Sequence, residues 1–388
     1  MAHETVLLDD AAVVRRLFDH IDHGSTDLSE GVWREPVAHY RSPERFAAET
    51  EVLLSGATAF CPSAALPDPG SFLARTAAGT PIVAVRGNDG RVRAFRNACR
   101  HRGSRVADGS GCAKAFVCRY HGWTYGLDGA LLHVPHEHGF PGLDPAARGL
   151  VPLTTVETRG LIFLSQGPPR PGETPLEALP PLLSPGRRLV QATEQELPVN
   201  WKIFVESFLE GYHIRSTHRD TFYPVQFDNL NVVELFGPHS RVTFPYRAIQ
   251  KLRALSPSEW HVEGKLTYVY HLFPNVMVAT FPHFVFMIAI EPLALDRTRF
   301  HTYVTAAGEE TDVGPIARPV RTTSAEGAAL IATAALEDNA ATIAIQEGLA
   351  SGANAFLEFG RFEGAIGHFH RTLRAALTAR GVASEVAP

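Results

Sequence analysis

The chain has 388 residues, a length that predicts two domains. Its composition, 45% hydrophobic and 20% charged, is that of a globular protein and excludes a disordered or collagen-like chain. The formal net charge of −5 provides no basic surface of the kind that binds nucleic acid. The longest apolar run, residues 284–290, is far shorter than the roughly 20 residues that span a bilayer. The acidic N-terminal residues do not resemble a signal peptide, so we expect a cytoplasmic protein that contacts no membrane.

The first part of the chain changes from helical to β-type patterns. Residues 1–55 predict polar helices, one of them starting at Pro43 behind the capping residue Ser42. Residues 58–166 hold short β-type runs separated by turns such as Asp89-Gly90, and an Asp-Gly pair between such runs is a hairpin signal. This stretch therefore predicts a small all-β module.

The rest of the chain predicts an antiparallel sheet with helices. Seven prolines in residues 167–187 indicate a linker or a surface loop. A helical pattern covers residues 199–213, and strand-like runs follow through 229–305, which favours one antiparallel sheet. Helices are predicted again for the Ala-rich residues 323–351 and for residues 364–380.

Two cysteines and two histidines of the β-rich stretch form a metal-ligand pattern. Cys99-x-His101 is followed, after 16 residues, by Cys118-x-x-His121. Two thiolates and two imidazoles suit either a tetrahedral zinc ion or a [2Fe–2S] cluster with two histidines on one iron. Glycines follow both histidines closely, where a backbone has to pass near a bulky cluster. The spacing differs from that of a C2H2 zinc finger, whose pairs are two cysteines and two histidines.

A second group of metal-ligating residue types lies in residues 200–213. If this segment is one helix, Glu206, Glu210 and His213 share a face beside an apolar stripe. His218 follows five residues after His213, where a turn can bring it back to the same point. A histidine pair of this kind is more often structural than ligating, so the group needs a further member.

The further member is predicted in the late helix. Asp338 falls within its apolar face, and a buried carboxylate needs a metal or a cationic partner to stay ionised. Glu337 is turned toward the polar side and is the weaker candidate. Two histidines and one carboxylate leave coordination positions open, which is the arrangement that activates O2 at non-haem Fe(II).

The two motifs resemble those of a known family. NACRHRGSRV and FVCRYHGWTYGLDG resemble the Rieske iron–sulfur motif, and NWKIFVESFLEGYHIRSTH resembles the iron-binding motif of the large (α) subunit of Rieske non-haem iron aromatic-ring-hydroxylating oxygenases. The resemblance covers nearly the whole chain. It implies an α+β fold in which a Rieske all-β iron–sulfur module is inserted near the N-terminus of a helix-grip catalytic domain with a curved antiparallel sheet.

The resemblance also implies domain limits. Residues 1–44 would be an N-terminal helical segment of the catalytic domain, and residues 45–166 the Rieske [2Fe–2S] domain. Residues 167–388 would form the catalytic domain with a mononuclear non-haem iron.

In this family each candidate residue has an expected role. Cys99 and Cys118 would bind one iron of the [2Fe–2S] cluster, and His101 and His121 the other. The mononuclear Fe(II) would be held by three further residues, which are His213, His218 and Asp338.

Three further residues are expected to be catalytic. Glu210 stands where the family commonly has an Asp that links His213 to His121 of the neighbouring subunit. Asn200 would lie near the mononuclear iron, and Glu206 would line the same subunit junction.

The expected function is that of the terminal oxygenase of a multicomponent Rieske system. An NAD(P)H-dependent reductase, with or without a ferredoxin, would supply electrons to activate O2 for hydroxylation, dihydroxylation or oxidative demethylation of a small organic substrate. The resemblance further implies a homotrimer, with or without a small β subunit. Two other classes fit parts of the pattern: a Rieske electron carrier without catalytic iron, and a zinc-stabilised protein that binds an apolar ligand.

The substrate class is the least determined part of this interpretation. Glu210 in place of Asp resembles the branch of the family that acts on quaternary ammonium compounds or amines, and this gives a slight preference for such substrates. Aromatic rings and natural products are the alternative substrates. An aromatic cage for a cation has many candidate residues, although most aromatic residues in strands belong to the core: Tyr212, Phe222, Tyr223, Phe227, Phe236, Phe244, Tyr246, Trp260, Tyr268, Phe281 and Phe284.

Overall fold

The computed structural model describes residues 7–170, 172–307 and 324–381, and for residues 324–330 it describes the backbone alone. The chain divides into two compact units. We call residues 54–169 together with residues 181–189 the β unit. The α+β unit consists of residues 1–53, residues 170–180 and residues 190–388. The β unit is thus inserted near the N-terminus of the α+β unit, and the expected fold class is confirmed.

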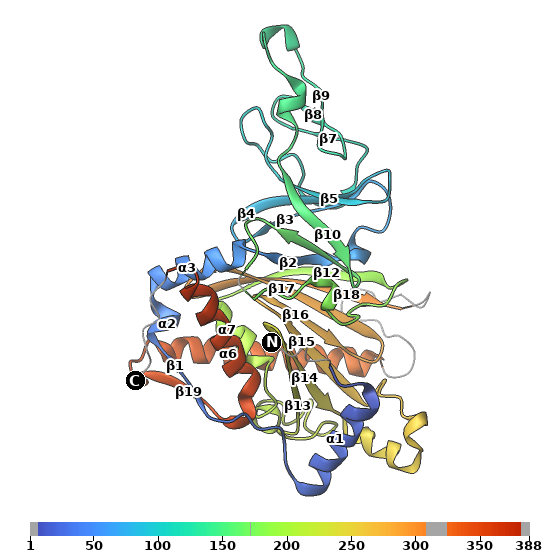
Figure 1. The fold of residues 1–388 in the computed structure, drawn as a ribbon, viewed down its shortest axis with the longest axis vertical. Coiled ribbons are helices and arrows are strands. Elements are labelled where there is room, and N and C mark those ends of the chain that lie inside the picture. The colour runs from blue at the N-terminus through green and yellow to red at the C-terminus, as the bar shows by residue number, and fades with distance from the viewer. Residues whose placement is uncertain (1–6, 171, 308–323, 382–388) are drawn as a thin grey trace. The chain divides into compact units, whose positions relative to one another are not determined.

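The β unit is built from two antiparallel sheets (Figure 1). The larger has the strand order β2-β11-β10-β5-β4-β3-β6, and the smaller is β7-β8-β9. The Asp-Gly pair at residues 89–90 does connect two strands, β4 and β5, and Gly90 has the positive φ that such a turn requires. The strands are β2 (Ala57–Pro62), β3 (Ser71–Ala77), β4 (Thr80–Arg86), β5 (Val92–Arg96), β6 (Gly109–Cys112), β7 (Phe116–Val117), β8 (Thr124–Tyr125), β9 (Leu131–His133), β10 (Pro152–Thr158) and β11 (Leu161–Ser165).

The α+β unit is organised around a seven-stranded antiparallel sheet of order β12-β18-β17-β16-β15-β14-β13 (Figure 1). Each strand from β13 to β18 pairs with the next one in the chain, so the predicted single antiparallel sheet is confirmed. The strands are β12 (Arg188–Leu197), β13 (Val232–Phe236), β14 (His239–Pro245), β15 (Leu266–Leu272), β16 (Val276–Thr280), β17 (Phe284–Ala294) and β18 (Arg297–Ala306).

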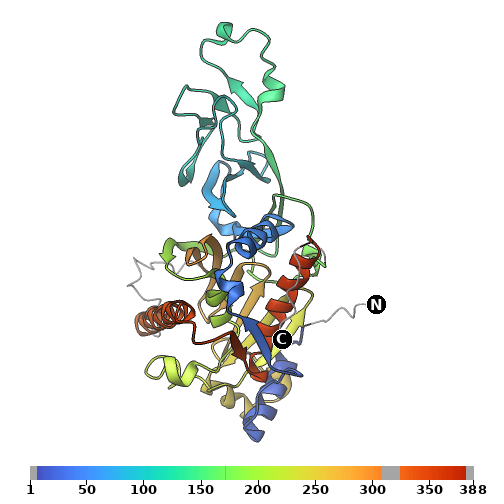
Figure 2. The ribbon, with the colours of Figure 1, turned by 90° about the vertical axis from the view of Figure 1, so that its left-hand side faces the viewer.

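Helices pack on this sheet and complete one core. Side chains of α4 and α7, among them Trp201 and Phe369, lie in the same buried cluster as Val242, Met277 and Phe300 of the sheet. Figure 2 views α6 nearly along its axis, and the segment with β19 joins it to α7. The helices are α1 (Asp10–His23), α2 (Ala38–Arg41), α3 (Pro43–Leu54), α4 (Trp201–Ser207), α5 (Ile214–Thr217), α6 (Ser324–Leu349) and α7 (Gly364–Thr378).

One small sheet was not anticipated by the sequence analysis. β1 (Trp33–Pro36) pairs with β19 (Phe356–Phe359), so part of the N-terminal segment expected to be helical is a strand. The edge strand β12 was also missed, because its mixed polar sequence shows no clean alternation.

The single helix predicted for residues 200–213 is wrong. Helix α4 ends at Ser207, and a separate short helix, α5, begins at Ile214. The Glu210 carboxylate accepts hydrogen bonds from the backbone N–H groups of Tyr212 and His213. A side chain that binds nearby backbone groups competes with the helix for them, and Gly211 adds to the break.

Candidate active site

The break after α4 places two histidines at the ends of one short helix. His213 is the residue before α5 and His218 the residue after it. The backbone N–H of His213 donates to Glu210 Oε2 at 3.2 Å, which fixes the start of α5. The His218 side chain is only 1% exposed, whereas that of His213 is 22% exposed.

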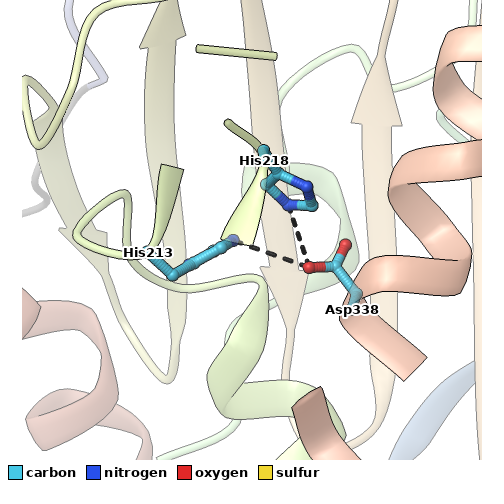
Figure 3. A group of neighbouring side chains, drawn as sticks. All are labelled: His213, His218 and Asp338. Atoms are coloured by element: carbon cyan, nitrogen blue, oxygen red, sulfur yellow. Dashed lines mark ion pairs between the residues drawn. The ribbon is translucent and has the colours of Figure 1, made fainter. Parts of the chain in front are cut away.

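His213, His218 and Asp338 converge on one point (Figure 3). Each offers a ligand atom, and these atoms lie within 4.8 Å of one another. Asp338 Oδ1 lies 3.0 Å from His218 Nε2 and 3.6 Å from His213 Nε2. Asp338 comes from α6, and its side chain is 21% exposed rather than fully buried as the sequence analysis expected. No other group of three or more His, Cys, Asp or Glu side chains among the described residues has this spacing of a single-metal site.

Each imidazole is oriented by a carboxylate of its own, in addition to Asp338. His213 Nδ1 is hydrogen-bonded to Glu210 Oε1, and His218 Nδ1 to Glu337 Oε2 at 2.8 Å. Thr221 Oγ1 donates to the same Glu337 oxygen at 2.7 Å. A ligating histidine commonly donates its other ring N–H to a carboxylate in this way, which leaves Nε2 available for the metal. The position of Glu337 on the polar side of its helix indicated only a weaker ligand, and no sequence pattern predicted this orienting contact.

The charges around the two histidines favour a bound cation. Burial lowers the pKa of His213, but the hydrogen bond and charge of Glu210 and the charge of Asp338 outweigh it, so the pKa is raised. For His218 the effect of burial is likewise outweighed by Asp338 and Glu337, and its pKa is raised. Carboxylates that favour the protonated, cationic form of these imidazoles also attract a divalent metal ion. The donor set of two histidines and one carboxylate suits Fe(II).

The three convergent side chains line one end of a large cavity in the α+β unit. Its volume is about 360 Å³, and no lysine or arginine is among the described residues that line it. The acidic residue on its wall is Asp338, and Gln226, Thr267 and Asn339 are among its polar residues. Phenylalanines supply much of the remaining surface: Phe204, Phe208, Phe222, Phe244, Phe281, Phe284, Phe286 and Phe300.

None of the three predicted catalytic residues, Glu210, Asn200 and Glu206, is among the described residues that line the cavity. Asn200 caps α4, and its Nδ2 donates to the carbonyl oxygens of Tyr40 at 3.2 Å and of Leu295 at 2.8 Å. Glu206 is buried, and its Oε1 accepts from Tyr40 Oη at 2.7 Å and from His370 Nε2 at 2.9 Å. The contacts of Asn200 are those of a structural cap, and those of Glu206 link it to α2 and α7.

The β unit presents its two cysteines and two histidines from two similar turns. In the first, the N–H of Gly103 donates to Cys99 O at 2.8 Å, and in the second, that of Gly122 donates to Cys118 O at 2.9 Å. Both glycines have a positive φ, of 80° and 73°, a conformation that an L residue with a side chain adopts at a cost. Both cysteines are buried, at 4% and 2% exposure.

These four residues fit a two-iron cluster better than a single ion. The rings of His101 and His121 lie 4.6 Å apart, and His101 Nδ1 is buried without a hydrogen-bond partner among the described residues. No three of these four residues bring their ligand atoms within 4.8 Å of one another. A tetrahedral zinc ion requires ligand atoms at that spacing. The hydroxyl of Tyr125 lies 3.2 Å from Cys99 Sγ, a contact that tunes a cluster through its sulfur.

Comparison with known families decides the assignment. The family described as "Ring hydroxylating alpha subunit (catalytic domain)" matches residues 187–379, and the family described as "Rieske [2Fe-2S] domain" matches residues 57–150. The chain belongs to the Rieske ring-hydroxylating oxygenase α-subunit family. Its members are Rieske-type oxygenases and oxidoreductases, so the predicted family and enzyme class are confirmed.

Similar proteins agree with this family. The chain is 30% identical over 243 residues to the carnitine monooxygenase oxygenase subunit of Acinetobacter pittii, covering 58% of this chain and 63% of that protein. It is 37% identical over 161 residues to the glycine betaine monooxygenase oxygenase subunit of Pseudomonas aeruginosa, covering 39% and 37%. These matches therefore span less than two thirds of either relative.

A solved structure confirms the fold. The quaternary ammonium Rieske monooxygenase CntA in complex with an inhibitor superposes with a TM-score of 0.73 at 23% identity, covering 90% of this chain and 96% of that chain. The cofactors of the family, a Rieske [2Fe–2S] cluster and a mononuclear iron, are those expected from the sequence, and the residues described above fit both. No helix within the described ranges has the length and hydropathy needed to cross a membrane.

Proposed function

We propose that this chain is the terminal oxygenase component of a multicomponent Rieske system. Electrons from an NAD(P)H-dependent reductase, directly or through a ferredoxin, support insertion of oxygen from O2 into a small organic substrate. The convergence of His213, His218 and Asp338 at a cavity of about 360 Å³ carries this proposal. An electron carrier needs no such ligand set beside a substrate-sized cavity, and a zinc-stabilised binding protein needs no second metal site.

The side chains of the chain have distinct parts in this function. We assign the cluster to Cys99, Cys118, His101 and His121, and the catalytic iron to His213, His218 and Asp338. When bound, the cluster supplies electrons one at a time and the iron supplies the chemistry of O2 activation.

The carboxylates beside the iron ligands position them. Glu210 and Glu337 accept hydrogen bonds from the Nδ1–H groups of the two histidines and hold their Nε2 atoms toward Asp338. We also propose that Glu210 connects the catalytic ligands to His121 of a neighbouring subunit, in the trimer that the family resemblance implies.

We further propose a substrate with a substituted ammonium or amine group and no carboxylate. Two relatives with 30% and 37% identity are named as oxygenase subunits that act on carnitine and glycine betaine. Phenyl rings stabilise a quaternary ammonium group through cation–π contacts, and the cavity has eight phenylalanines. Carnitine and glycine betaine also carry a carboxylate, and the described cavity wall has no lysine or arginine to pair with it.

The same wall favours a second candidate, a neutral aromatic substrate. An apolar cavity with a few polar side chains is typical of sites for uncharged organic molecules. In both cases the substrate would lie beside the three ligands, where Phe208, Phe222 and Asn339 also line the cavity.

A product assay with a defined panel tests the proposal. The purified protein would be reduced anaerobically and exposed to O2 with single compounds, and products would be followed by mass. The panel sets choline and benzyltrimethylammonium against carnitine and glycine betaine, with indole as the neutral ring. Product from the first pair alone supports the proposed substrate, and product from carnitine or glycine betaine contradicts the exclusion of carboxylates. A colourless protein that cannot be reconstituted with iron and sulfide would overturn the oxygenase proposal.

A further inference from the structure

Two groups of polar side chains lie far apart on the wall of the large cavity. Gln191, Thr193 and Gln195 belong to β12, the edge strand of the sheet, and are exposed or half-buried. Gln226 and Thr267 are buried, at 4% and 3% exposure. Thr267 lies on β15, four strands away from β12, which at about 4.8 Å per strand is roughly 19 Å along the sheet. One polar group is therefore near solvent, and the other lies inside the protein.

A backbone pairing places Tyr246 beside Gln226. The two residues form an isolated antiparallel bridge, and next to it the N–H of Arg247 donates to Val225 O at 2.7 Å. Residues that are opposite each other in such a pair have their side chains on the same side. The Gln226 amide and the Tyr246 ring therefore share one side of this pairing.

Strand pairing brings Thr267 to the Tyr246 hydroxyl. Thr267 of β15 is opposite Phe244 of β14, and Tyr246 follows Phe244 by two residues, which puts these side chains on one face. Tyr246 Oη lies 2.8 Å from Thr267 Oγ1. Burial raises the pKa of Tyr246 by more than the hydrogen bonds of Thr267 and Gln226 lower it, so the hydroxyl keeps its proton at neutral pH. We call Gln226, Thr267 and Tyr246 the polar trio.

The polar trio has more hydrogen-bonding groups than its own contacts use. A glutamine amide has two N–H donors and an oxygen that accepts twice, and each hydroxyl donates once and accepts twice. Within the described residues, the side-chain contacts of these groups are with one another. The neighbouring side chains on the cavity wall are apolar, among them Phe244 and Val269. Because a buried polar group without a partner is costly, Gln226 and Thr267 are suited to bind a polar group of a ligand.

A short segment of chain connects the polar trio to the proposed iron ligands. The ring centroids of His218 and Phe222 are 5.0 Å apart, and the N–H of Gln226 donates to Phe222 O at 2.8 Å. The three ligand side chains line the same cavity as Gln226 and Thr267. A small molecule whose polar group is held by the trio would thus have its other atoms in the cavity that these ligands also line.

A hydroxyl is the ligand group that matches this arrangement. It donates and accepts, as do the amide of Gln226 and the hydroxyl of Thr267, whereas a carbonyl oxygen only accepts. A carboxylate would bring a negative charge to a wall that has no lysine or arginine among its described residues. A methyl group would leave the trio unpaired, and a site that is built to bind a hydroxyl rejects the analogue that lacks it.

We propose that Gln226 and Thr267, positioned by Tyr246, form a subsite that binds one hydroxyl group of the substrate. The subsite deepens the proposed function and rests on it, because it names a further group of the molecule that is oxidised there. The substrate is then an alcohol, whether its other end is a substituted ammonium group or a neutral ring. The trio binds and orients this hydroxyl, and no bond of the substrate changes at the subsite.

Two pairs of ligands test the subsite by binding. Choline and propyltrimethylammonium differ by a hydroxyl in place of a methyl group, and so do benzyl alcohol and ethylbenzene. Calorimetric titration of the anaerobic holoenzyme would give the affinity for each compound. In at least one pair we expect the hydroxyl compound to bind at least about tenfold more tightly, because the methyl group leaves buried polar groups unpaired. Equal affinities within both pairs would overturn the proposal.

Substitutions assign the preference to the polar trio. Gln226→Leu removes the amide but keeps a side chain of similar size, and it should reduce the affinity ratio within the pair to less than about twofold. Thr267→Val and Tyr246→Phe each remove one hydroxyl and should reduce the ratio by smaller factors. Gln250→Leu is the matched control, because Gln250 is exposed and is not among the described residues that line the cavity. An unchanged ratio in Gln226→Leu, or in Thr267→Val if Gln226→Leu does not fold, would overturn the proposal.

Product analysis separates the subsite from the proposed function. A preference for the hydroxyl compound that Gln226→Leu removes would support the subsite even if no compound were oxidised, and the proposed function alone would then fail. Oxidation of both members of a pair with the same kcat/KM would support the proposed function and overturn the subsite.

Discussion

The two proposed metal-binding regions of this chain obtain their histidines in different ways. In the β unit, Cys99, His101, Cys118 and His121 come from two local turns within one short stretch of sequence. In the α+β unit, two histidines flank α5, and two of the carboxylates that face them, Glu337 and Asp338, come from α6. One site is thus formed by neighbouring residues in sequence, and the other by the tertiary fold.

The two regions also differ in electrostatics. Burial, together with His121 and Arg102, lowers the pKa of His101. By contrast, carboxylates raise the pKa of His213 and of His218. A neutral histidine is suited to bind a resident cluster. A histidine surrounded by carboxylates is suited to a site whose negative charge is balanced by a divalent ion.

The largest expected effect is the independent loss of each metal. We expect His213→Ala to abolish product formation and mononuclear iron while the visible spectrum of the cluster remains. Cys118→Ala should remove the cluster spectrum and retain the catalytic iron. Iron and sulfide analysis with absorption spectra would check both variants. An unchanged ratio of iron to sulfide in His213→Ala would contradict the assignment of the catalytic ligands.

Removing the negative charge of Glu210 should come next in size. Glu210→Gln keeps an acceptor for His213 Nδ1 but loses the negative charge. We expect both metals to remain bound and product formation to fall by about a hundredfold, because electron delivery is no longer coupled to O2 activation. Metal content, cluster reduction and product yield would be measured together. Turnover at the wild-type rate would show that Glu210 has no bridging role.

A smaller effect is expected for the carboxylate behind His218. Loss of a carboxylate that orients a ligating histidine commonly costs about 10- to 100-fold in metal affinity or activity. We therefore expect Glu337→Gln to weaken iron binding within that range, with the cluster unchanged. Competition against a chelator would measure the affinity. Because Glu347 of the same helix has an exposed side chain, Glu347→Gln is the matched control and should bind iron as the wild type does.

The smallest effect is a difference in the pH at which the two regions lose metal. A protonated histidine does not bind metal, and a raised pKa means that protonation competes with iron at a higher pH. Lowering the pH from about 7 to about 6.5 should release mononuclear iron first, because each histidine that becomes protonated lowers the affinity by at most about tenfold per pH unit. Metal content after dialysis at stepped pH would check the order, and earlier loss of the cluster would contradict it.

The same contrast explains what the sequence could predict. The turns that carry Cys99 and Cys118 depend on nearby glycines, so their motif is visible in a few residues. Most strands of the large sheet were also predictable, because their apolar runs are separated by clear turns. The pairing of β1 with β19 joins two ends of the chain, and no local pattern indicates it.

Around the catalytic ligands, local reasoning gave the residues but not their geometry. Hydrophobic periodicity predicts that α4 continues through Glu210. A periodic pattern does not show that the Glu210 side chain binds the backbone N–H groups that follow it. Glu337 was given a low rank from its place on the helix, yet its partner His218 lies 119 residues earlier in the sequence. The buried contacts of Glu206 likewise come from elements at both ends of the chain.

The separation of His218 from α6 in sequence has a consequence for folding. A metal ion held by His213, His218 and Asp338, as we propose, would cross-link two distant parts of the α+β unit and close a loop of more than a hundred residues. Because the unfolded chain does not present these ligands together, each tenfold rise in free iron above the dissociation constant adds about 1.4 kcal/mol to the free energy of unfolding. Iron supply would then set the stability of the folded protein as well as the fraction of it that is able to react.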